Sequence, residues 1–452
     1  MPQAALEELL ALGRVEGDAE IAGADPVLRT PYRVGTAGAA ALAAVGVAAA
    51  ELWKLRTGRR QRVAVDLRAA AASLRSGAYL RIDGKPPPPI WDPLSAFYPV
   101  RGGRWVRFHC NYPHHRRAAM QVLGVAEDRA AAQAASADRD GLELEDAIHA
   151  AGGCAGLART AEEWAQHPQA QAVAGQPLLE IEKIGEAPPQ PLPPGERPLA
   201  AVRVLDLTRV LAGPTCARTL AEHGADVLKI TAAHLPDSGD VDLDTGLGKL
   251  SAHLDLRTAG GSETLRQLLC DADVFSQSYR PGSLAARGFS AEALAKLRPG
   301  IVYVSLSAWG QTGPWKDRRG FDSIVQTVSG MAYAQGGAKP QLLPCSAIDY
   351  VSGYLMAFGA MVALARRARE GGSWRVRVAL ARTGKWIVDR GSVDASQVPA
   401  ELPAEELAGL TTETASPAGR IGHLRPVARL SETPPFWARP PVPLGHHRPK
   451  WP

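Results

Sequence analysis

The sequence predicts an α/β protein with a doubly wound parallel sheet and a smaller α+β domain. Beyond residue 200, short apolar runs typical of strands alternate with helical segments, and such alternation is typical of parallel sheets covered by helices. The predicted strands are 201–207, 225–230, 273–278 and 300–310, and the predicted helices include 213–224 and 264–272. Earlier in the chain, residues 97–111 have the pattern of a hairpin with a Gly-Gly turn, and predicted helices follow it, which favours a separate α+β unit.

Proline-rich stretches and changes of composition divide the chain into six parts. The division is into a helical lead-in (1–33), a partial copy of a later segment (34–80), the small domain (90–185), a linker (186–200), the large domain (201–395) and an extended tail (396–452). The linker GEAPPQPLPPGERPLA is the clearest boundary, because so many prolines prevent both helix and central strand.

Two distant segments resemble each other. Residues 34–74 and 349–387 each contain a glycine-containing aliphatic helix, a basic turn and a strand. Aligning Gly38 with Gly353 places Val34 opposite Asp349, so the first copy lacks this carboxylate. We interpret the pair as a partial duplication in which only one copy carries an acid, although two alanine-rich units can also look alike by composition.

Composition narrows the class of ligand. The chain has a formal charge of +5, and no basic stripe is interleaved with aromatics, so we expect a small anionic ligand rather than nucleic acid.

The five cysteines are widely spaced without a CxxC pair, which predicts a reducing cytoplasm and no zinc site. Residues 34–53 are long enough to span a membrane, but they consist mainly of alanine and glycine, and the N-terminus lacks a basic signal region. We therefore expect a buried helix and no membrane partner.

Five motifs in one order resemble those of the family III CoA transferases, the CaiB/BaiF family that includes formyl-CoA transferase. They are VRVLDLTRVLAGPTCARTLAEHGADVLKI (202–230), DTGLGKLSAHLDLRT (244–258), the segment from ADVFSQSYRPG to GQTGPW (272–315), RRGFDSIVQTVSGMA (318–332) and LLPCSAIDYVSGYLMAFGAMVAL (342–364). The stretches GRWVRFHCNYPHH and TAEEWAQHP are similar to the small domain that normally follows the large one. The chain is thus identified as a rearranged, half-duplicated member.

The resemblance implies transfer of CoA from an acyl-CoA thioester to a carboxylic acid through a mixed anhydride on an aspartate. Asp349 matches the family's nucleophile, and covalent catalysis of this kind divides one hard exchange into easier steps. Coenzyme A and acyl-CoA are then substrates, and no cofactor is bound permanently. The positions that the resemblance assigns to CoA binding are Arg209, Val210, Leu211, Ala212, Lys249, Ser278, Tyr279, Arg280, Arg319, Phe321 and Asp322.

The resemblance also implies partners. Members of the family pair as interlocked rings, so we expect a homodimer. The unusual order of the halves leaves open a monomer that completes its own site. The acyl donor and the acid acceptor are not specified by any charged motif.

Several alternatives stand beside this interpretation. Asp349 could be only a helix N-cap. A catalytically silent CoA-binding or scaffold protein would explain the acid missing from the first copy and the departure at Ser278-Tyr279, where the family often has Asn-Phe. A related racemase of acyl-CoA esters uses the His of a GHD motif as an acid–base group, but Phe321 stands there in this chain and cannot carry a proton.

Other groups have competing interpretations. The histidines of HCNYPHH (His109, His114 and His115) could bind a metal, but no ligand spacing completes a site and a loop or interface role is favoured. Cys345 lies near Asp349, yet no base accompanies it, so a small buried residue is favoured over a nucleophile. An oxyanion intermediate needs N–H donors, for which the candidates are Gly330, Gly336 and Gly337.

Overall fold

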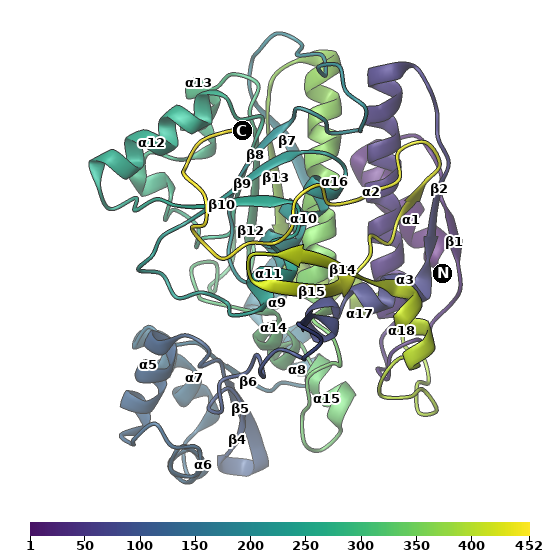
Figure 1. The fold of residues 1–452 in the computed structure, drawn as a ribbon. Coiled ribbons are helices and arrows are strands. Elements are labelled where there is room, and N and C mark those ends of the chain that lie inside the picture. Colours follow the sequence, from purple (N-terminus) through teal and green to yellow (C-terminus); the bar gives the residue numbers. More distant parts are fainter.

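A seven-stranded sheet forms the centre of the computed structural model, which describes residues 1–452 (Figure 1). The strand order is β10-β9-β8-β11-β12-β13-β7; β8 to β13 run parallel, and β7 is antiparallel to β13. The strands are β7 (Glu180–Gly185), β8 (Arg203–Leu207), β9 (Asp226–Thr231), β10 (Lys249–His253), β11 (Val274–Gln277), β12 (Val302–Ser307) and β13 (Ser373–Ala379). The predicted doubly wound α/β fold is confirmed.

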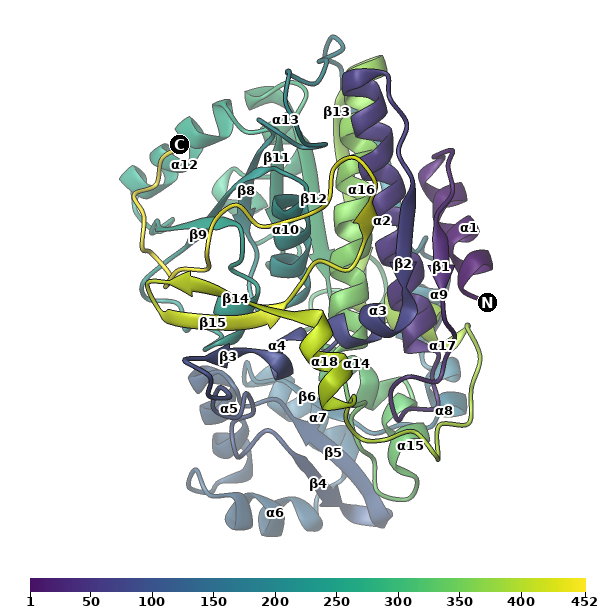
Figure 2. The ribbon, with the colours of Figure 1, turned by 45° about the vertical axis from the view of Figure 1, so that its right-hand side comes forward.

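Helices cover both faces of this sheet (Figures 1 and 2). A buried cluster of 17 residues joins one face to α12 (Ala259–Cys270) and α13 (Ala291–Leu297). The largest cluster joins the other face to α10 (Ala212–Glu222), α16 (Ala347–Glu370) and α17 (Leu380–Val388). The chain builds outward from β8 to β10 and then resumes at β11 on the other side of β8, so the strand order reverses between β8 and β11. Ligands of such sheets bind beyond the carboxyl ends of the strands at this point.

The small domain is a separate layer below the sheet in Figure 1. It contains β4 (Phe97–Val100), β5 (Arg104–Phe108), β6 (Ala155–Leu157), α5 (Pro113–Leu123), α6 (Arg129–Ala137) and α7 (Gly141–Ala150). The predicted hairpin is present: β4 and β5 are antiparallel, and Gly102 and Gly103 turn between them at φ 74° and 70°. A core of 15 buried residues belongs to this domain alone.

The predicted end of the small domain at residue 185 is wrong. Strand β7 pairs with β13 at the edge of the large sheet. Helices α8 (Ala161–Gln166) and α9 (Pro168–Ala174) also belong with the large domain, since the ring of Trp164 lies 6.2 Å from that of Trp309 and 5.7 Å from that of Trp315. The chain thus returns to the large domain directly after β6, because its next apolar groups pack there.

The N-terminal part contains a second, smaller sheet. Strand β2 (Val63–Asp66) lies between the parallel β1 (Glu20–Ala22) and the antiparallel β16 (Arg429–Leu430), as β13 lies between the parallel β12 and the antiparallel β7. Helix α1 (Pro2–Gly13) precedes this sheet, and α2 (Val34–Thr57) and α3 (Leu67–Ser73) flank β2. This arrangement repeats one edge of the large sheet without β8 to β11.

The structure corrects the alignment of the two copies. Ala347, at the start of α16, lies 313 residues after Val34, and Leu380, at the start of α17, lies 313 residues after Leu67. At the same spacing, a Cβ on Gly46 would lie 2.5 Å from Val63, and one on Gly359 would lie 2.6 Å from Val376. Each helix therefore needs a glycine where it crosses the strand that follows it.

In this register Thr36, and not Val34, lies opposite Asp349, because the glycines aligned from sequence are not equivalent. The local geometry agrees. Asp25 accepts hydrogen bonds from the backbone N–H groups of Gly35 (3.1 Å) and Thr36 (2.7 Å), and Asp322 accepts one from the backbone N–H of Asp349 (3.0 Å). The first copy keeps the helix cap and lacks the second acid.

The segment predicted as an extended tail is folded. Helix α18 (Ala404–Leu410) leads into a hairpin of β14 (Thr411–Ser416) and β15 (Gly419–Leu424), and β15 pairs with β3 (Arg81–Ile82). The β-branched residues of TTETAS and the turn at PAG supply the strand and turn signals that the prediction passed over.

Helices α2 and α16 are both long and apolar enough to cross a membrane by length and composition. Within their most apolar windows, 89% and 100% of the residues are buried inside the fold. The two helices lie side by side in Figures 1 and 2, and an ion pair between Glu51 and Arg369 joins them near their C-terminal ends. The buried helix expected at 34–53 is present as the core of α2.

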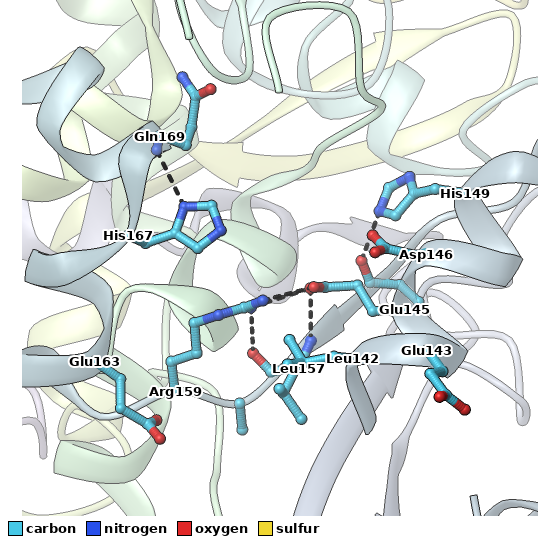
Figure 3. A network of polar contacts seen from close by, with 12 residues as sticks. Leu142, Glu143, Glu145, Asp146, His149, Leu157, Arg159, Glu163, His167 and Gln169 are labelled. Atoms are coloured by element: carbon cyan, nitrogen blue, oxygen red, sulfur yellow. Dashed lines mark hydrogen bonds and ion pairs between the residues drawn. The ribbon is translucent and has the colours of Figure 1, made fainter. Parts of the chain in front are cut away.

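A buried ion pair joins the small domain to the chain that leads back to the large domain (Figure 3). The Arg159 guanidinium lies 2.6 Å from Glu145 on α7, and both side chains are almost fully buried. Glu145 also accepts a hydrogen bond from the backbone N–H of Leu157 (2.9 Å), and Arg159 lies over the ring of Trp315. This network holds α7, β6 and the large domain together.

Removing one partner should therefore be costly. We expect Glu145→Leu to lower the free energy of unfolding by about 3–5 kcal/mol, because the Arg159 charge would remain buried and unpaired. Urea unfolding followed by tryptophan fluorescence measures this. The control is Lys385→Ala in the exposed pair with Asp389, expected to change stability by about 0.5 kcal/mol or less. Equal effects of the two variants would contradict the role of the network.

Candidate active site

The loop after β8 meets the loop after β11 at the reversal of strand order. The backbone N–H of Arg209 donates to the hydroxyl of Ser278 (3.1 Å), which ties the two loops together. Val210 has a φ of 71°, which is unfavourable for a β-branched residue. Such strain is held in place only by surrounding contacts and is concentrated at functional sites. The conformation of the loop after β8 is therefore fixed by its contacts within the large domain.

A cavity of about 280 Å³ opens at these loops. Segments that follow β8, β11 and β12 form most of its wall, and α5 of the small domain closes one side with Tyr112, His114 and His115 nearby. Four basic side chains of the wall make no ion pair: Arg209, Arg280, Lys316 and Arg319. Asp349 is the one acidic residue of the wall. The cavity is thus suited to a ligand with several negative charges.

Asp349 is the third residue of α16, and its position depends on a close helix contact. A Cβ on Gly353 would lie 2.5 Å from the carbonyl oxygen of Ala212, so glycine lets α16 approach the start of α10. The Asp349 residue is 7% exposed, and its carboxylate has no hydrogen-bond or ion-pair partner. It does not cap its helix, which contradicts the N-cap interpretation.

Asp322 stabilises the start of α16 instead. It is the first residue of α14 (Asp322–Val328), and it accepts hydrogen bonds from the Asp349 backbone N–H and from the Gln326 side chain. Burial raises the pKa of Asp322 to about 6, against the effect of these bonds. Burial, and then the charge of Asp322, raise the pKa of Asp349 well above its ordinary value. The hydrogen bonds to Asp322 therefore favour ionisation of Asp322 over ionisation of Asp349.

A second cavity, of about 450 Å³, lies on the other side of Asp349. The proline-rich connector 88–93 forms one wall, and Asp322 and His109 line it together with Asp349. Five residues line both cavities: Tyr112, Val210, Leu211, Phe321 and Asp349. The unpartnered Asp349 carboxylate is therefore the one acidic group in the wall that the two cavities share.

Comparison with known proteins agrees with this geometry. The model of CoA-transferase family III matches residues 12–190 and 199–405, on both sides of the proline-rich linker. The chain belongs to CoA-transferase family III. The acetyl-coenzyme A transferase nodX of Hypoxylon pulicicidum is 36% identical over 201 residues, which are 43% of this chain and 34% of that protein.

Other relatives match over similar lengths. The succinyl-CoA–L-malate CoA-transferase beta subunit of Chloroflexus aurantiacus is 34% identical over 201 residues, 40% of this chain and 49% of that protein. A crystal structure of a CaiB/BaiF family protein from Brucella suis is 28% identical, covers 43% of this chain and 56% of that chain, and has a TM-score of 0.39. The family III chain spans half or less of the length of these two curated relatives.

Most positions assigned to CoA binding in the family III chain lie together. Nine of them line the basic cavity: Arg209, Val210, Leu211, Ala212, Ser278, Tyr279, Arg280, Arg319 and Phe321. Asp322 lines the second cavity. Lys249 lies in neither wall; it is 1% exposed, and its ammonium lies 2.8 Å from Asp206 and 2.8 Å from the carbonyl oxygen of Pro214. The burial and the ion pair of Lys249 favour a structural role over the CoA contact that the resemblance implies.

The small-domain histidines form an aromatic interface, as favoured from sequence. The ring of His109 stacks on Phe321 with centroids 3.7 Å apart, and no group of side chains has the composition of a metal site. Burial lowers the pKa of His109 to about 3 and that of His115 to about 2, so both are neutral. A base this weak does not replace the missing histidine of the racemase motif.

The remaining candidates lie outside the cavities. Cys345 is buried, and burial raises its pKa to about 12, so it is a thiol and not a nucleophile. Gly330 packs against Ala161, and neither it nor Gly336 and Gly337 line a cavity with Asp349, so they are not placed as oxyanion donors. Sequence reasoning missed Tyr112 and Lys316 as wall residues, and only the order of the loops after the strands indicates them.

The structural role of Lys249 predicts an effect on stability. Lys249→Met would leave Asp206 buried without its counter-ion, and we expect a loss of about 3–5 kcal/mol in the free energy of unfolding. Urea unfolding measures this, and Asp206→Asn combined with Lys249→Met should recover part of the loss. CoA affinity of the folded Lys249→Met protein, measured by calorimetry, should change little. A large drop in affinity without a drop in stability would restore Lys249 as a ligand contact.

Proposed function

We propose that the chain transfers CoA from an acyl-CoA thioester to a carboxylic acid, with Asp349 as the covalent carboxylate. The supporting observation is that the Asp349 carboxylate is buried, has no partner, and lies between a basic cavity and a second cavity. A buried carboxylate without a partner is costly to the fold, so its retention favours a chemical role.

The basic cavity suits CoA. Coenzyme A carries a 3′-phosphate and a pyrophosphate, and unpaired arginine and lysine side chains bind such groups through charge-assisted hydrogen bonds. Arg280 and Lys316 are exposed at the edge of the cavity, whereas Asp349 lies at its buried end. We infer that the phosphates bind at the edge and that the thioester reaches inward to Asp349.

The chemistry balances with the aspartate alone. A carboxylate oxygen of Asp349 bonds to the thioester carbonyl carbon, the C–S bond breaks, and CoA leaves as a thiolate, giving a mixed anhydride. The thiolate then attacks the Asp349 carbonyl carbon, which releases the donor acid and leaves an aspartyl-CoA thioester. The acceptor carboxylate repeats these steps in reverse and regenerates the Asp349 carboxylate. No net proton or electron is gained or lost.

Trapping tests the covalent step. We expect acetyl-, butyryl- or succinyl-CoA followed by hydroxylamine to convert Asp349 to a hydroxamate, because hydroxylamine attacks both the anhydride and the aspartyl thioester. Peptide mass spectrometry identifies the modified residue. Asp349→Ala should abolish the product, whereas Asp317→Ala, an exposed acid outside both cavities, should not.

The other outcomes distinguish the alternatives. CoA binding with an unmodified Asp349 for every donor would favour a silent binding or scaffold protein. Exchange of the α-proton of an acyl-CoA in deuterated water, without hydroxamate, would favour the racemase-like reaction. Either result would overturn the proposal.

The Asp322–Asp349 pair predicts a pH effect. The pKa of Asp349 is raised well above its ordinary value, and the residue acts as an ionised carboxylate. Acylation should therefore become faster as the pH rises through that pKa, because the ionised fraction of Asp349 increases. Asp322→Asn removes the neighbouring charge but keeps an oxygen that accepts the Asp349 N–H bond. The low-pH limb of the rate profile should therefore move to lower pH by about one unit. Hydroxamate formation between about pH 5 and 9 measures it.

The matched control for this profile is Asp317→Asn, which changes an acid outside both cavities. It should leave the low-pH limb in place. A limb that stays fixed in Asp322→Asn, or moves to higher pH, would show that Asp322 does not set the ionisation of Asp349.

A further inference from the structure

The second cavity differs from the first in the sign of its charges. Its wall contains no lysine or arginine, and its one histidine, His109, is kept neutral by burial. Five carboxyl groups line it: Asp92, Asp237, Asp240, Asp322 and Asp349. Asp92 is paired with Arg116 at 2.7 Å, whereas Asp237 and Asp240 have no ion pair. The lining itself therefore presents negative charges to a ligand, while Arg107 lies over the ring of Trp91 and Arg209 over the ring of Tyr112, outside the lining.

Apolar side chains form another part of the wall, which also contains the polar residues Asn111, Ser238, Ser323 and Ser346. The connector supplies Pro88, Pro89, Ile90 and Trp91, and the opposite side supplies Tyr112 and Phe321. Ile90 and Trp91 are 52% and 38% exposed, which is unusual for side chains of this size. An apolar ligand that covers them would remove this surface from water and gain hydrophobic free energy.

Two unpartnered polar groups point to a ligand in this cavity. The Asp349 carboxylate is buried and has no hydrogen bond, and the Nδ1 atom of His109 is buried and has no partner. His109 is 4% exposed and lies in the wall with Asp349. The cavity therefore contains the reacting group together with the apolar side chains of the connector.

We propose that this cavity holds the acyl group, in donor and acceptor alike, and selects monocarboxylic acids with an apolar tail against acids that carry a second carboxylate. The proposal rests on the proposed function, because it describes the acyl partner of Asp349. A second carboxylate would face Asp237 and Asp240 and would lose its hydration without gaining an arginine or lysine. An alkyl or aryl tail has no such cost and contacts Trp91 and Phe321.

Matched pairs of acyl groups test the selection. Butyryl-CoA and succinyl-CoA have the same chain length and differ by one carboxylate, as do valeryl-CoA and glutaryl-CoA. The measurement is the rate at which each ester acylates Asp349, trapped with hydroxylamine at equal concentrations. We expect the monocarboxylic acyl group to react about 10- to 100-fold faster in each pair, as like charges placed together disfavour binding.

A charge reversal at the wall provides the second test. In Asp240→Lys, a cation would replace an unpaired acid, so the preference for butyryl-CoA over succinyl-CoA should shrink by about tenfold. Glu263→Lys is the matched control, because it makes the same change of charge on α12, outside both cavities, and it should leave the ratio unchanged. The ratio is taken within one protein, so partial unfolding of a variant does not affect it.

The outcomes separate the two proposals. Acylation of Asp349 at equal rates by both members of a pair, or faster acylation by succinyl-CoA, would overturn the selection and leave the transfer mechanism intact. An unchanged ratio in Asp240→Lys would show that the second cavity does not hold the acyl tail. Absence of the Asp349 adduct with all four esters would overturn the proposed function itself.

Discussion

The site depends on one hydrogen bond, from the backbone N–H of Asp349 to the Asp322 carboxylate. An α-helix begins with backbone N–H groups that have no partner within the helix, and a nearby carboxylate normally satisfies them. In this chain that carboxylate comes from α14, so the Asp349 side chain does not have to accept the hydrogen bonds at the start of α16. It can face the cavities without a partner. An aspartate at the start of a helix usually caps that helix. Here Asp322 provides the cap, so the Asp349 carboxylate is available to react.

The duplicated segment separates these two tasks. The first copy keeps the cap, since Asp25 accepts the N–H bonds of Gly35 and Thr36, and it has threonine in the place of Asp349. It also lacks the strands β8 to β11 and hence the loops that form the basic cavity. The cap and the helix crossing at Gly46 survive because the fold needs them. The carboxylate is present only where the loops are present, and this coincidence favours a chemical role for Asp349.

Much of this could be predicted from sequence. The alternation of strands and helices after residue 200 was sufficient for the doubly wound sheet, and motif order placed Asp349 and nine other wall residues. Lys249 was misplaced because sequence does not show where a long side chain points, and this one bends to a buried Asp206. The sequence alignment of the two copies is wrong by two residues, because glycines are frequent in both helices. Only the contacts with Val63 and Val376 identify Gly46 and Gly359 as the equivalent glycines. The hairpin at 411–424 was missed because prolines on either side outweighed its strand signal.

The small domain determines whether these parts form one site. A Cβ on Gly156 in β6 would lie 2.9 Å from Val328, so β6 packs directly against α14, which begins at Asp322. The ion pair of Glu145 and Arg159 fixes the same strand from its other side, because the Leu157 backbone N–H donates to Glu145. A shift of the small domain would therefore move α14, and with it the acid that caps α16. The ring of Phe321, next to Asp322, stacks on His109 of the small domain. The position of Asp349 is thus linked, through Asp322, to residues of the small domain, which precedes the linker in the sequence. One chain therefore supplies both sides of the cavity.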